Sequence, residues 1–198
     1  MDSRYKYLIK NTGILTISSF STKILTFLMV PLYTSVLTTE EYGTYDLAVS
    51  TVSLLIPILS VNIVDGVMRY SMDSRYDRAD IFSIGLRRIS VAAFIFAAIL
   101  AANSVFHITN VFAGEELLIL LYFISTLLYS LLTQFAKGCE AVKQMAIAGI
   151  ISTVCLVGTN ILLLLVFELG VTGFFIASCA SQLSLIHISE PTRRRGIS

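Results

Sequence analysis

Residues 89–106 read ISVAAFIFAAILAANSVF and contain no charged side chain. A helix needs about 20 mostly apolar residues to cross the roughly 30 Å hydrocarbon core of a bilayer, so this stretch is close to one complete span. Similar apolar runs cover residues 11–39 (interrupted only by Lys23), 47–64, 117–136 and 144–167. The sequence therefore predicts an all-α membrane protein that folds as a polytopic helical bundle.

The composition agrees with this class. Of the 198 residues, 56% are hydrophobic and only 14% are charged, and the mean hydropathy is +0.82. Few water-soluble domains have such a composition. We expect an N-terminal transmembrane bundle over residues 1–182, with helices near 11–37, 44–66, 86–106, 117–136 and 145–167 and an incomplete sixth over 170–182. Pro57 would bend the second helix and free backbone carbonyls there.

Basic residues alternate from one connection to the next. They occur before the first span, between the second and third, and between the fourth and fifth, as Arg4, Lys6, Lys10, Arg69, Arg75, Arg78, Arg87, Arg88, Lys137 and Lys143. The other connections carry acidic residues, namely Glu40, Glu41, Glu115, Glu116 and Glu168. Lys and Arg are enriched in cytoplasmic loops. The pattern predicts a multi-pass protein of the cytoplasmic membrane whose N-terminus is cytoplasmic.

The last residues have an unusual sequence. Residues 183–193 read LSLIHISEPTR, which resembles the in-frame translation of a transposase-type sequencing adapter. We therefore expect the native sequence to be visible only as far as Gln182, and residues 183–198 not to be native. The alternative is a native basic tail, TRRRGIS, that binds anionic lipid beside the membrane.

Catalytic and metal-binding motifs are missing from the sequence. There is no GxSxG, HExxH, Walker loop or glycine-rich phosphate loop, and no Cys/His cluster. We therefore expect no enzyme, no catalytic residue, no metal, no cofactor and no nucleic-acid partner. The remaining candidates are polar groups inside the membrane, which are costly there and commonly mark a pathway or a pair.

Lys23 is the sharpest of these candidates, because it lies near the middle of the first span. Its stem cannot easily carry the ammonium to water by snorkelling, so it must face a cavity, a counter-ion, or both. It would either offer positive charge to an anionic substrate group in a central cavity or form an internal ion pair that only fixes helix packing.

A second group of polar residues ends the second span. Asp65 and Arg69 are four residues apart, so they share a helix face and can pair. Asn62 lies one turn before Asp65, on nearly the same side. We expect Lys23, Asn62, Asp65 and Arg69 to line the substrate cavity, with a purely structural Asp65–Arg69 pair as the alternative.

Residues 25–73 carry a resemblance to a known family. Pro31-Leu32-Tyr33-Thr34, the turn LTTEEYG over 37–43, and Arg69-Tyr70 at the end of the second span are similar to the opening of Wzx-type polysaccharide flippases. That family belongs to the multidrug/oligosaccharidyl-lipid/polysaccharide exporter superfamily. The remainder of the chain is similar only in hydropathy and spacing.

The resemblance implies a MATE-like transporter of two pseudo-symmetric bundles around a typically cationic cavity, of which this chain is the first half. Such a protein moves an undecaprenyl-diphosphate-linked oligosaccharide by alternating access. Its partners would be that lipid-linked oligosaccharide, membrane lipids and the polysaccharide assembly machinery. Because burying a diphosphate in hydrocarbon is very costly, a carrier of this kind needs binding groups rather than catalytic ones.

Other classes of function remain open from the residues. A cation-coupled multidrug exporter of the same superfamily would use membrane-embedded acids, and Lys23 argues against it. A membrane-embedded transferase would show acids and histidines clustered at one membrane face, and the sequence has none. A purely structural subunit predicts that Lys23 can be replaced without loss of function.

Overall fold

The computed structural model describes residues 3–107, 109, 111–112 and 114–196. Within these residues the chain is helical, apart from short connections. The elements are α1 (Ser3–Val36), α2 (Thr39–Ser60), α3 (Ile63–Ser71), α4 (Arg78–Phe106), α5 (Glu116–Gly138), α6 (Val142–Ile161), the π-helical segment η1 (Leu162–Val166) and α7 (Gly170–Gly196). The chain is an all-α polytopic membrane protein.

Local sequence signals set where these helices begin. At α2, Thr38 and Glu41 form a capping box in which the Thr38 side chain accepts from the Glu41 backbone N–H and the Glu41 carboxylate accepts from the Thr38 N–H at 2.8 Å. At α4, the Asp77 carboxylate accepts from the Ala79 N–H, also at 2.8 Å. Both caps satisfy backbone donors that a helix leaves unpaired at its start.

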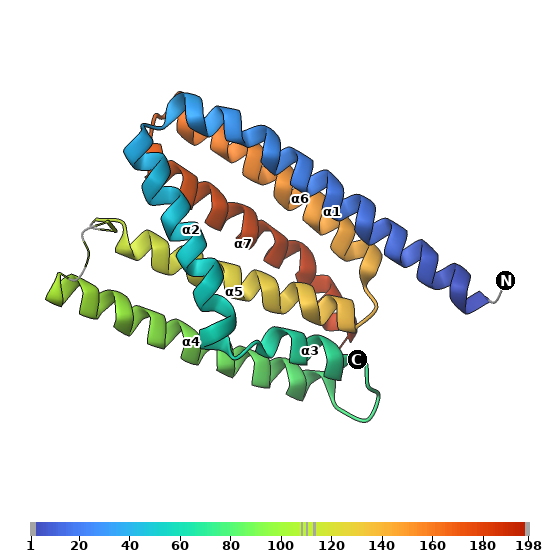
Figure 1. Cartoon of the computed structure of the whole chain (residues 1–198). Helices are drawn as coiled ribbons and strands as arrows, with labels where there is room; N and C mark the ends of the chain where they lie inside the picture. Colours follow the sequence, from blue (N-terminus) through green and yellow to red (C-terminus); the bar gives the residue numbers. More distant parts are fainter. Residues whose placement is uncertain (1–2, 108, 110, 113, 197–198) are drawn as a thin grey trace.

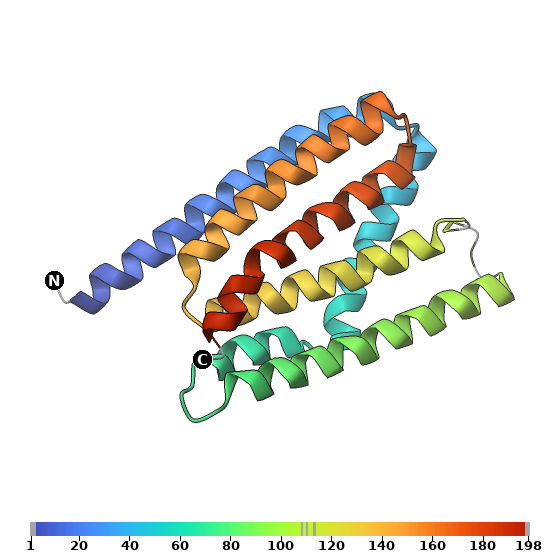
Figure 2. The same ribbon diagram turned by 180° about the vertical axis from the view of Figure 1, so that it is seen from behind.

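The long helices lie side by side as one layer, which α2 and α3 cross on one face (Figures 1 and 2). Helix α1 packs along α6, α7 packs between α6 and α5, and α4 packs against α5. Helix α3 packs against both α4 and α5. The connection between α2 and α3 therefore packs against other helices of the bundle and is not an outer loop.

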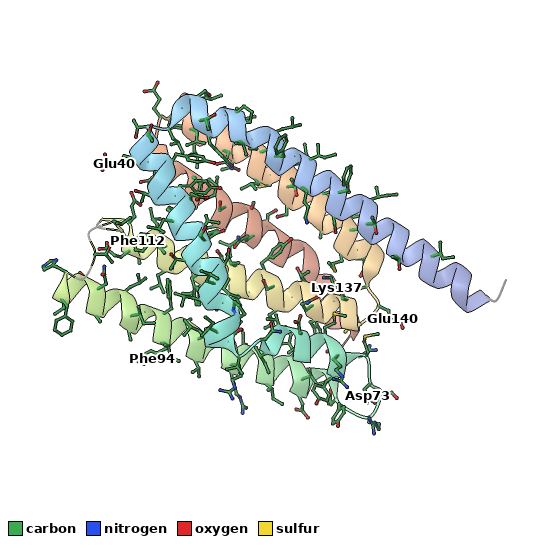
Figure 3. The ribbon with its side chains drawn as sticks, viewed as in Figure 1. Glu40, Asp73, Phe94, Phe112, Lys137 and Glu140 are labelled. Carbon is green, nitrogen blue, oxygen red and sulfur yellow. The ribbon has the colours of Figure 1, made fainter. Side chains whose placement is uncertain are left out.

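The two ends of the bundle differ in charge. The α1–α2, α4–α5 and η1–α7 connections meet at one end, and the α3–α4 and α5–α6 connections meet at the other, where the N-terminus also lies (Figure 1). Figure 3 shows Glu40 and Phe112 at the first end and Asp73, Lys137 and Glu140 at the second. The first end carries Glu40, Glu41, Glu115, Glu116 and Glu168. The alternation of charge along the sequence is thus a separation of charge in space.

The outer surface of the bundle is strongly apolar. Within the described part of the chain, four helical stretches are long and apolar enough to cross a membrane, namely Thr39–Ser60, Arg78–Phe106, Glu116–Gly138 and Gln144–Val166. At most 28% of such an apolar window is buried. Phe27, Phe94 and Phe106 are each more than 70% exposed. Water would not tolerate so much exposed apolar surface, so these side chains face lipid.

Inside the bundle, helices approach closely at glycines. A Cβ at Gly85 on α4 would lie 2.7 Å from Leu131 Cδ1 on α5 and 2.8 Å from Val67 Cγ2 on α3. A Cβ at Gly138 would lie 2.7 Å from the Met68 carbonyl oxygen of α3. Small residues permit such close backbone approach in membranes. These two glycines hold α3 against α4 and α5.

The helix that we expected over 44–66 is not continuous, and this expectation was wrong. Helix α2 ends at Ser60, and α3 starts at Ile63. Val61 and Asn62 between them are both left-handed, with φ of 52° and 49°. Neither residue is a glycine. Asn tolerates the left-handed conformation, but the β-branched Val61 does not favour it, so two successive left-handed residues were not expected here.

Helices α1, α4 and α7 extend past the bounds that we expected for them. Helix α1 begins at Ser3, α4 begins at Arg78, and α7 continues through Gln182 to Gly196. The proposed adapter-derived segment 183–198 is therefore largely helical in its backbone, and its side chains beyond Ser184 lie outside the described residues. Its origin stays a prediction.

Candidate functional site

The break between α2 and α3 is the most unusual backbone in the described chain. Two successive left-handed residues without glycine are rare, and for the β-branched Val61 this conformation is strained by roughly 1–2 kcal/mol. The Val61 N–H donates to the Ile58 carbonyl at 3.3 Å, and the Asn62 N–H donates to the Pro57 carbonyl at 3.0 Å. The end of α2 is thus closed by backbone hydrogen bonds, and the chain restarts as a separate short helix. Strain of this kind is a reason to look for function.

Polar side chains gather at the start of α3. The Asn62 Nδ2 donates to Asp65 Oδ2 at 2.7 Å. From α5, Gln134 Nε2 donates to Asp65 Oδ1 at 2.8 Å. Each carboxylate oxygen of Asp65 therefore accepts from a neutral amide, one from its own helix and one from a helix 69 residues away in sequence. We call Asn62, Asp65 and Gln134 the amide–carboxylate cluster.

The position of Asp65 suits its negative charge. It lies in the first turn of α3, where the unpaired backbone N–H groups and the helix dipole favour an anion. The side chains of Asn62 and Asp65 are exposed, and that of Gln134 is half-buried. The Gln134 Oε1 is buried without a hydrogen-bond partner. The cluster therefore combines a reachable carboxylate with an unused carbonyl oxygen beside it.

The structural alternative, an ion pair between Asp65 and Arg69, is not recorded between these two described residues. Among the described residues the recorded ion pair is Arg75–Asp73, at 2.6 Å, and Asp65 is occupied by the two amides. Arg69 lies one turn further along α3 with an exposed side chain. The expected shared face is present, but amide donors replace the guanidinium as partners of the carboxylate.

Lys23 lies apart from this cluster. It is on α1, which packs along α6, whereas α3 packs against α4 and α5. Its side chain is exposed, and no ion pair is recorded for it with the described residues. Among the described residues, Lys23 therefore has no recorded ion pair of the kind that would only fix helix packing. A role in a substrate cavity stays a prediction.

Two amide side chains were missed because the candidates were chosen from ionisable groups, with Asn62 added only as a neighbour of Asp65. One is Gln134. The other is Asn160, which is fully buried on α6 with neither Oδ1 nor Nδ2 hydrogen-bonded. Asn160 directly precedes Ile161, after which the π-helical segment η1 begins, and such segments are frequent at functional sites. Both residues are amides inside apolar runs, and a search of the sequence for such amides would have found them.

The family of the chain follows from its sequence. Residues 8–189 match a family model described as polysaccharide biosynthesis protein. This chain belongs to that family. No curated protein and no solved structure matches the chain. The family has a role in polysaccharide synthesis or export.

The match covers all elements of the site. It begins in α1 and ends in α7, so Lys23, the strained break and the amide–carboxylate cluster all lie within it. It also includes residues 183–189, the first part of the segment that we expected to be adapter-derived.

The arrangement offers binding groups. No group of three or more His, Cys, Asp or Glu side chains that could hold a metal occurs among the described residues. The cluster provides a carboxylate and two amides beside a broken helix, and Lys23 lies apart from it on α1. Groups of this kind can hydrogen-bond a polar ligand.

Proposed function

We propose that this protein is a membrane exporter that flips an undecaprenyl-diphosphate-linked oligosaccharide for surface polysaccharide biosynthesis. The proposal rests mainly on the family match over residues 8–189. The break in the second span supports it. In this proposal the bundle is the first of two pseudo-symmetric halves, and the substrate crosses between them by alternating access. The protein acts as a carrier and not as an enzyme.

The broken helix supports a transport role. Transporters bind polar substrates near discontinuous membrane helices, whose free ends offer backbone dipoles and polar side chains inside the membrane. The strained residues Val61 and Asn62 separate α2 from α3, and the amide–carboxylate cluster lies at the free end of α3. The amides and carboxylate would hydrogen-bond sugar hydroxyls, and Arg69 would attract the diphosphate. Lys23, which lies apart on α1, would add positive charge elsewhere in the cavity.

The separation of charge supports an orientation. The end of the bundle that holds Arg69, Arg75, Arg78 and Lys137 would be cytoplasmic under the positive-inside rule. The N-terminus lies at that same end (Figure 1). The protein would then sit in the cytoplasmic membrane with its N-terminus inside, facing the compartment where the lipid-linked sugar is made.

The test uses the protein expressed from its complete gene in a strain that lacks its own exporter. Lys23→Ala and Lys23→Glu are expected to abolish surface polysaccharide while membrane insertion stays normal. Lys137→Ala is the matched control, since Lys137 lies at the end of the bundle (Figure 3), and it is expected to retain export. Normal surface polysaccharide in both Lys23 variants would refute the cavity role.

A second candidate function is a cation-coupled multidrug exporter of the same superfamily. One observation favours it: Asp65 accepts from two neutral amides and is not paired with Arg69, so its charge is free to attract a cation. Transport assays with the complete protein separate the two candidates. A flippase moves lipid-linked oligosaccharide and tolerates Asp65→Asn in part, whereas a coupled exporter moves cationic drugs and loses ion dependence with Asp65→Asn.

A further inference from the structure

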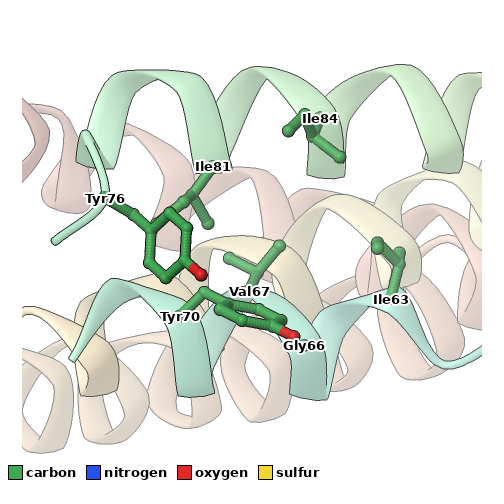
Figure 4. A pocket seen from close by; sticks show the side chains of 7 residues that line it. All are labelled: Ile63, Gly66, Val67, Tyr70, Tyr76, Ile81 and Ile84. Carbon is green, nitrogen blue, oxygen red and sulfur yellow. The ribbon is translucent and has the colours of Figure 1, made fainter. Parts of the chain in front are cut away.

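A pocket lies between α3 and α4, outside the amide–carboxylate cluster. Its volume is about 380 Å³, within the range of roughly 300–1,000 Å³ that is typical of ligand sites. The lining residues are Ile63, Gly66, Val67, Tyr70, Tyr76, Ile81 and Ile84. Figure 4 shows the two tyrosine rings at one end of this pocket and Ile63 and Ile84 toward the other.

The lining is apolar, with polar groups only at one end. Ile63, Val67, Ile81 and Ile84 supply aliphatic walls. Tyr70 and Tyr76 meet edge to face, with ring centroids 5.4 Å apart at an angle of 87°. Half of each tyrosine side chain remains exposed, at 50% and 48%. Such a lining suits a hydrocarbon chain whose polar end lies near the tyrosines.

Arginines occur on both helices that form the pocket and in the loop between them. Arg75 lies 5.9 Å from the centre of the Tyr76 ring. Arg69 directly precedes Tyr70, Arg78 lies one turn before Ile81, and Arg88 lies one turn after Ile84. These four side chains, and Arg87, are exposed. Residues 63–88 hold these five arginines and four aspartates, Asp65, Asp73, Asp77 and Asp80, so the segment carries one net positive charge. Arg75 is paired with Asp73, and an anionic group would neutralise the remaining excess.

The pocket lies where the apolar spans end. The second apolar run ends at residue 64, and the third begins at residue 89. The pocket residues lie between these limits, apart from Ile63, which borders the second run. The head-group layer adds roughly 5–7 Å on each side of the hydrocarbon, and tyrosines are enriched there. The Ile63–Ile84 end thus borders hydrocarbon, and the tyrosine end lies among head groups.

We propose that this pocket binds an anionic phospholipid of the surrounding leaflet. Its phosphate pairs with the arginines of the rim, and one acyl chain lies along Ile81, Val67 and Ile84 before it leaves past Ile63 into the hydrocarbon. Basic pockets between helices at the membrane surface bind anionic lipid head groups in this way. The lipid is a resident ligand and not the transported cargo, so the proposal is independent of which substrate the protein exports.

The chain offers a direct way to fill the pocket. A Cβ at Gly66 would have only Ile63 Cδ1 nearby, at 4.0 Å, so Gly66→Leu projects into the space that the acyl chain would take. Gly158 on α6 is the matched control, because nothing lies within 4 Å of a Cβ there. Gly158→Leu makes the same change on a helix that does not line the pocket.

The experiment measures lipid retention by native mass spectrometry. Purified protein in neutral detergent is titrated with phosphatidylglycerol, with cardiolipin and with phosphatidylcholine. We expect the two anionic lipids to bind more tightly than phosphatidylcholine, and Gly66→Leu to weaken their binding by about tenfold or more, equivalent to about 1.4 kcal/mol. Gly158→Leu should bind as the unmodified protein does.

A second variant tests the head-group contact separately. The double change Arg78→Gln and Arg88→Gln alters exposed side chains only, and it should remove the preference for anionic over zwitterionic lipid. Equal binding of phosphatidylglycerol and phosphatidylcholine to the unmodified protein would overturn the proposal. So would identical lipid binding by Gly66→Leu and Gly158→Leu. Displacement of the lipid by soluble glycerol phosphate at equal concentration would also overturn the proposal, because it would mean that the acyl chain contributes nothing to binding.

Discussion

Gln134 on α5 donates a hydrogen bond of 2.8 Å to the carboxylate of Asp65 on α3. This contact joins α3, the short helix after the break, to α5, one of the long helices of the layer. Asp65 also accepts from Asn62, at 2.7 Å. The same carboxylate therefore anchors the beginning of α3 and links it to α5.

Removing this contact should destabilise the bundle moderately. Gln134→Leu deletes the α5 donor and leaves Asp65 with one amide, and hydrogen bonds to charged groups contribute roughly 1.5–3 kcal/mol. We expect a lower thermal midpoint in detergent. A double-mutant cycle with Asp65→Leu isolates the pair. Additive effects of the two single changes would contradict a direct coupling.

The spans and this cluster differ in how far the sequence predicts them. Hydropathy is a local property, so the apolar run at 89–106 predicts its helix directly. The contact of Gln134 with Asp65 joins residues 69 positions apart, and only the packing of α3 on α5 brings them together. Asn62 and Asp65 were expected to share a face, and they do. The partner from α5 could not be chosen, because one sequence does not say which helices are neighbours.

The break after Ser60 was hidden for a different reason. Chains commonly turn left-handed at Gly, and here Val61 and Asn62 take that conformation. Pro57 predicted a bend, and α2 does end a few residues after it. Pro57 therefore indicated where α2 is interrupted, but not that the chain turns left-handed and restarts as a separate helix.

Replacing Val61 with Gly should stabilise the protein. Val61 has φ of 52° and is 69% exposed, so glycine removes left-handed strain of about 1–2 kcal/mol while little packing is lost. The expected result is a higher thermal midpoint. Val154→Gly is the control, because Val154 is 59% exposed inside α6 and glycine in a helix interior costs about 1 kcal/mol. A lower midpoint for Val61→Gly would mean that the left-handed residue is not strained.

The Asp73–Arg75 pair predicts a shifted titration at the rim of the lipid pocket. Hydrogen bonds from the Arg75 side chain and backbone hold the pKa of Asp73 below its usual value. Because the folded pKa is the lower one, the pair stabilises the loop above the unfolded pKa of about 3.9. That contribution is lost as the pH falls through the folded pKa.

Carboxyl NMR of the protein in detergent should therefore give a titration midpoint for Asp73 below about 3.9. Arg75→Gln removes the side-chain donor that lowers the pKa most and should move the midpoint back toward that value. An unchanged Asp73 midpoint in this variant would exclude Arg75 as the cause.

The glycine contacts predict that α3 is held by shape as well as by hydrogen bonds. A Cβ at Gly138 would lie 2.6 Å from Ser71 Cβ and 2.7 Å from the Met68 carbonyl oxygen. The carbonyl is backbone and cannot move aside without shifting α3, so Gly138→Ala should separate α3 from α5. Overpacking of this kind costs roughly 1–3 kcal/mol.

At Gly158 the same change meets open space, and it should raise stability by up to about 1 kcal/mol because alanine favours the helix. Thermal unfolding of both variants in one detergent measures the difference. If Gly138→Ala were as stable as Gly158→Ala, the end of α5 would not pack against α3 at this distance, and α3 would be held by its packing at Gly85 and by Gln134.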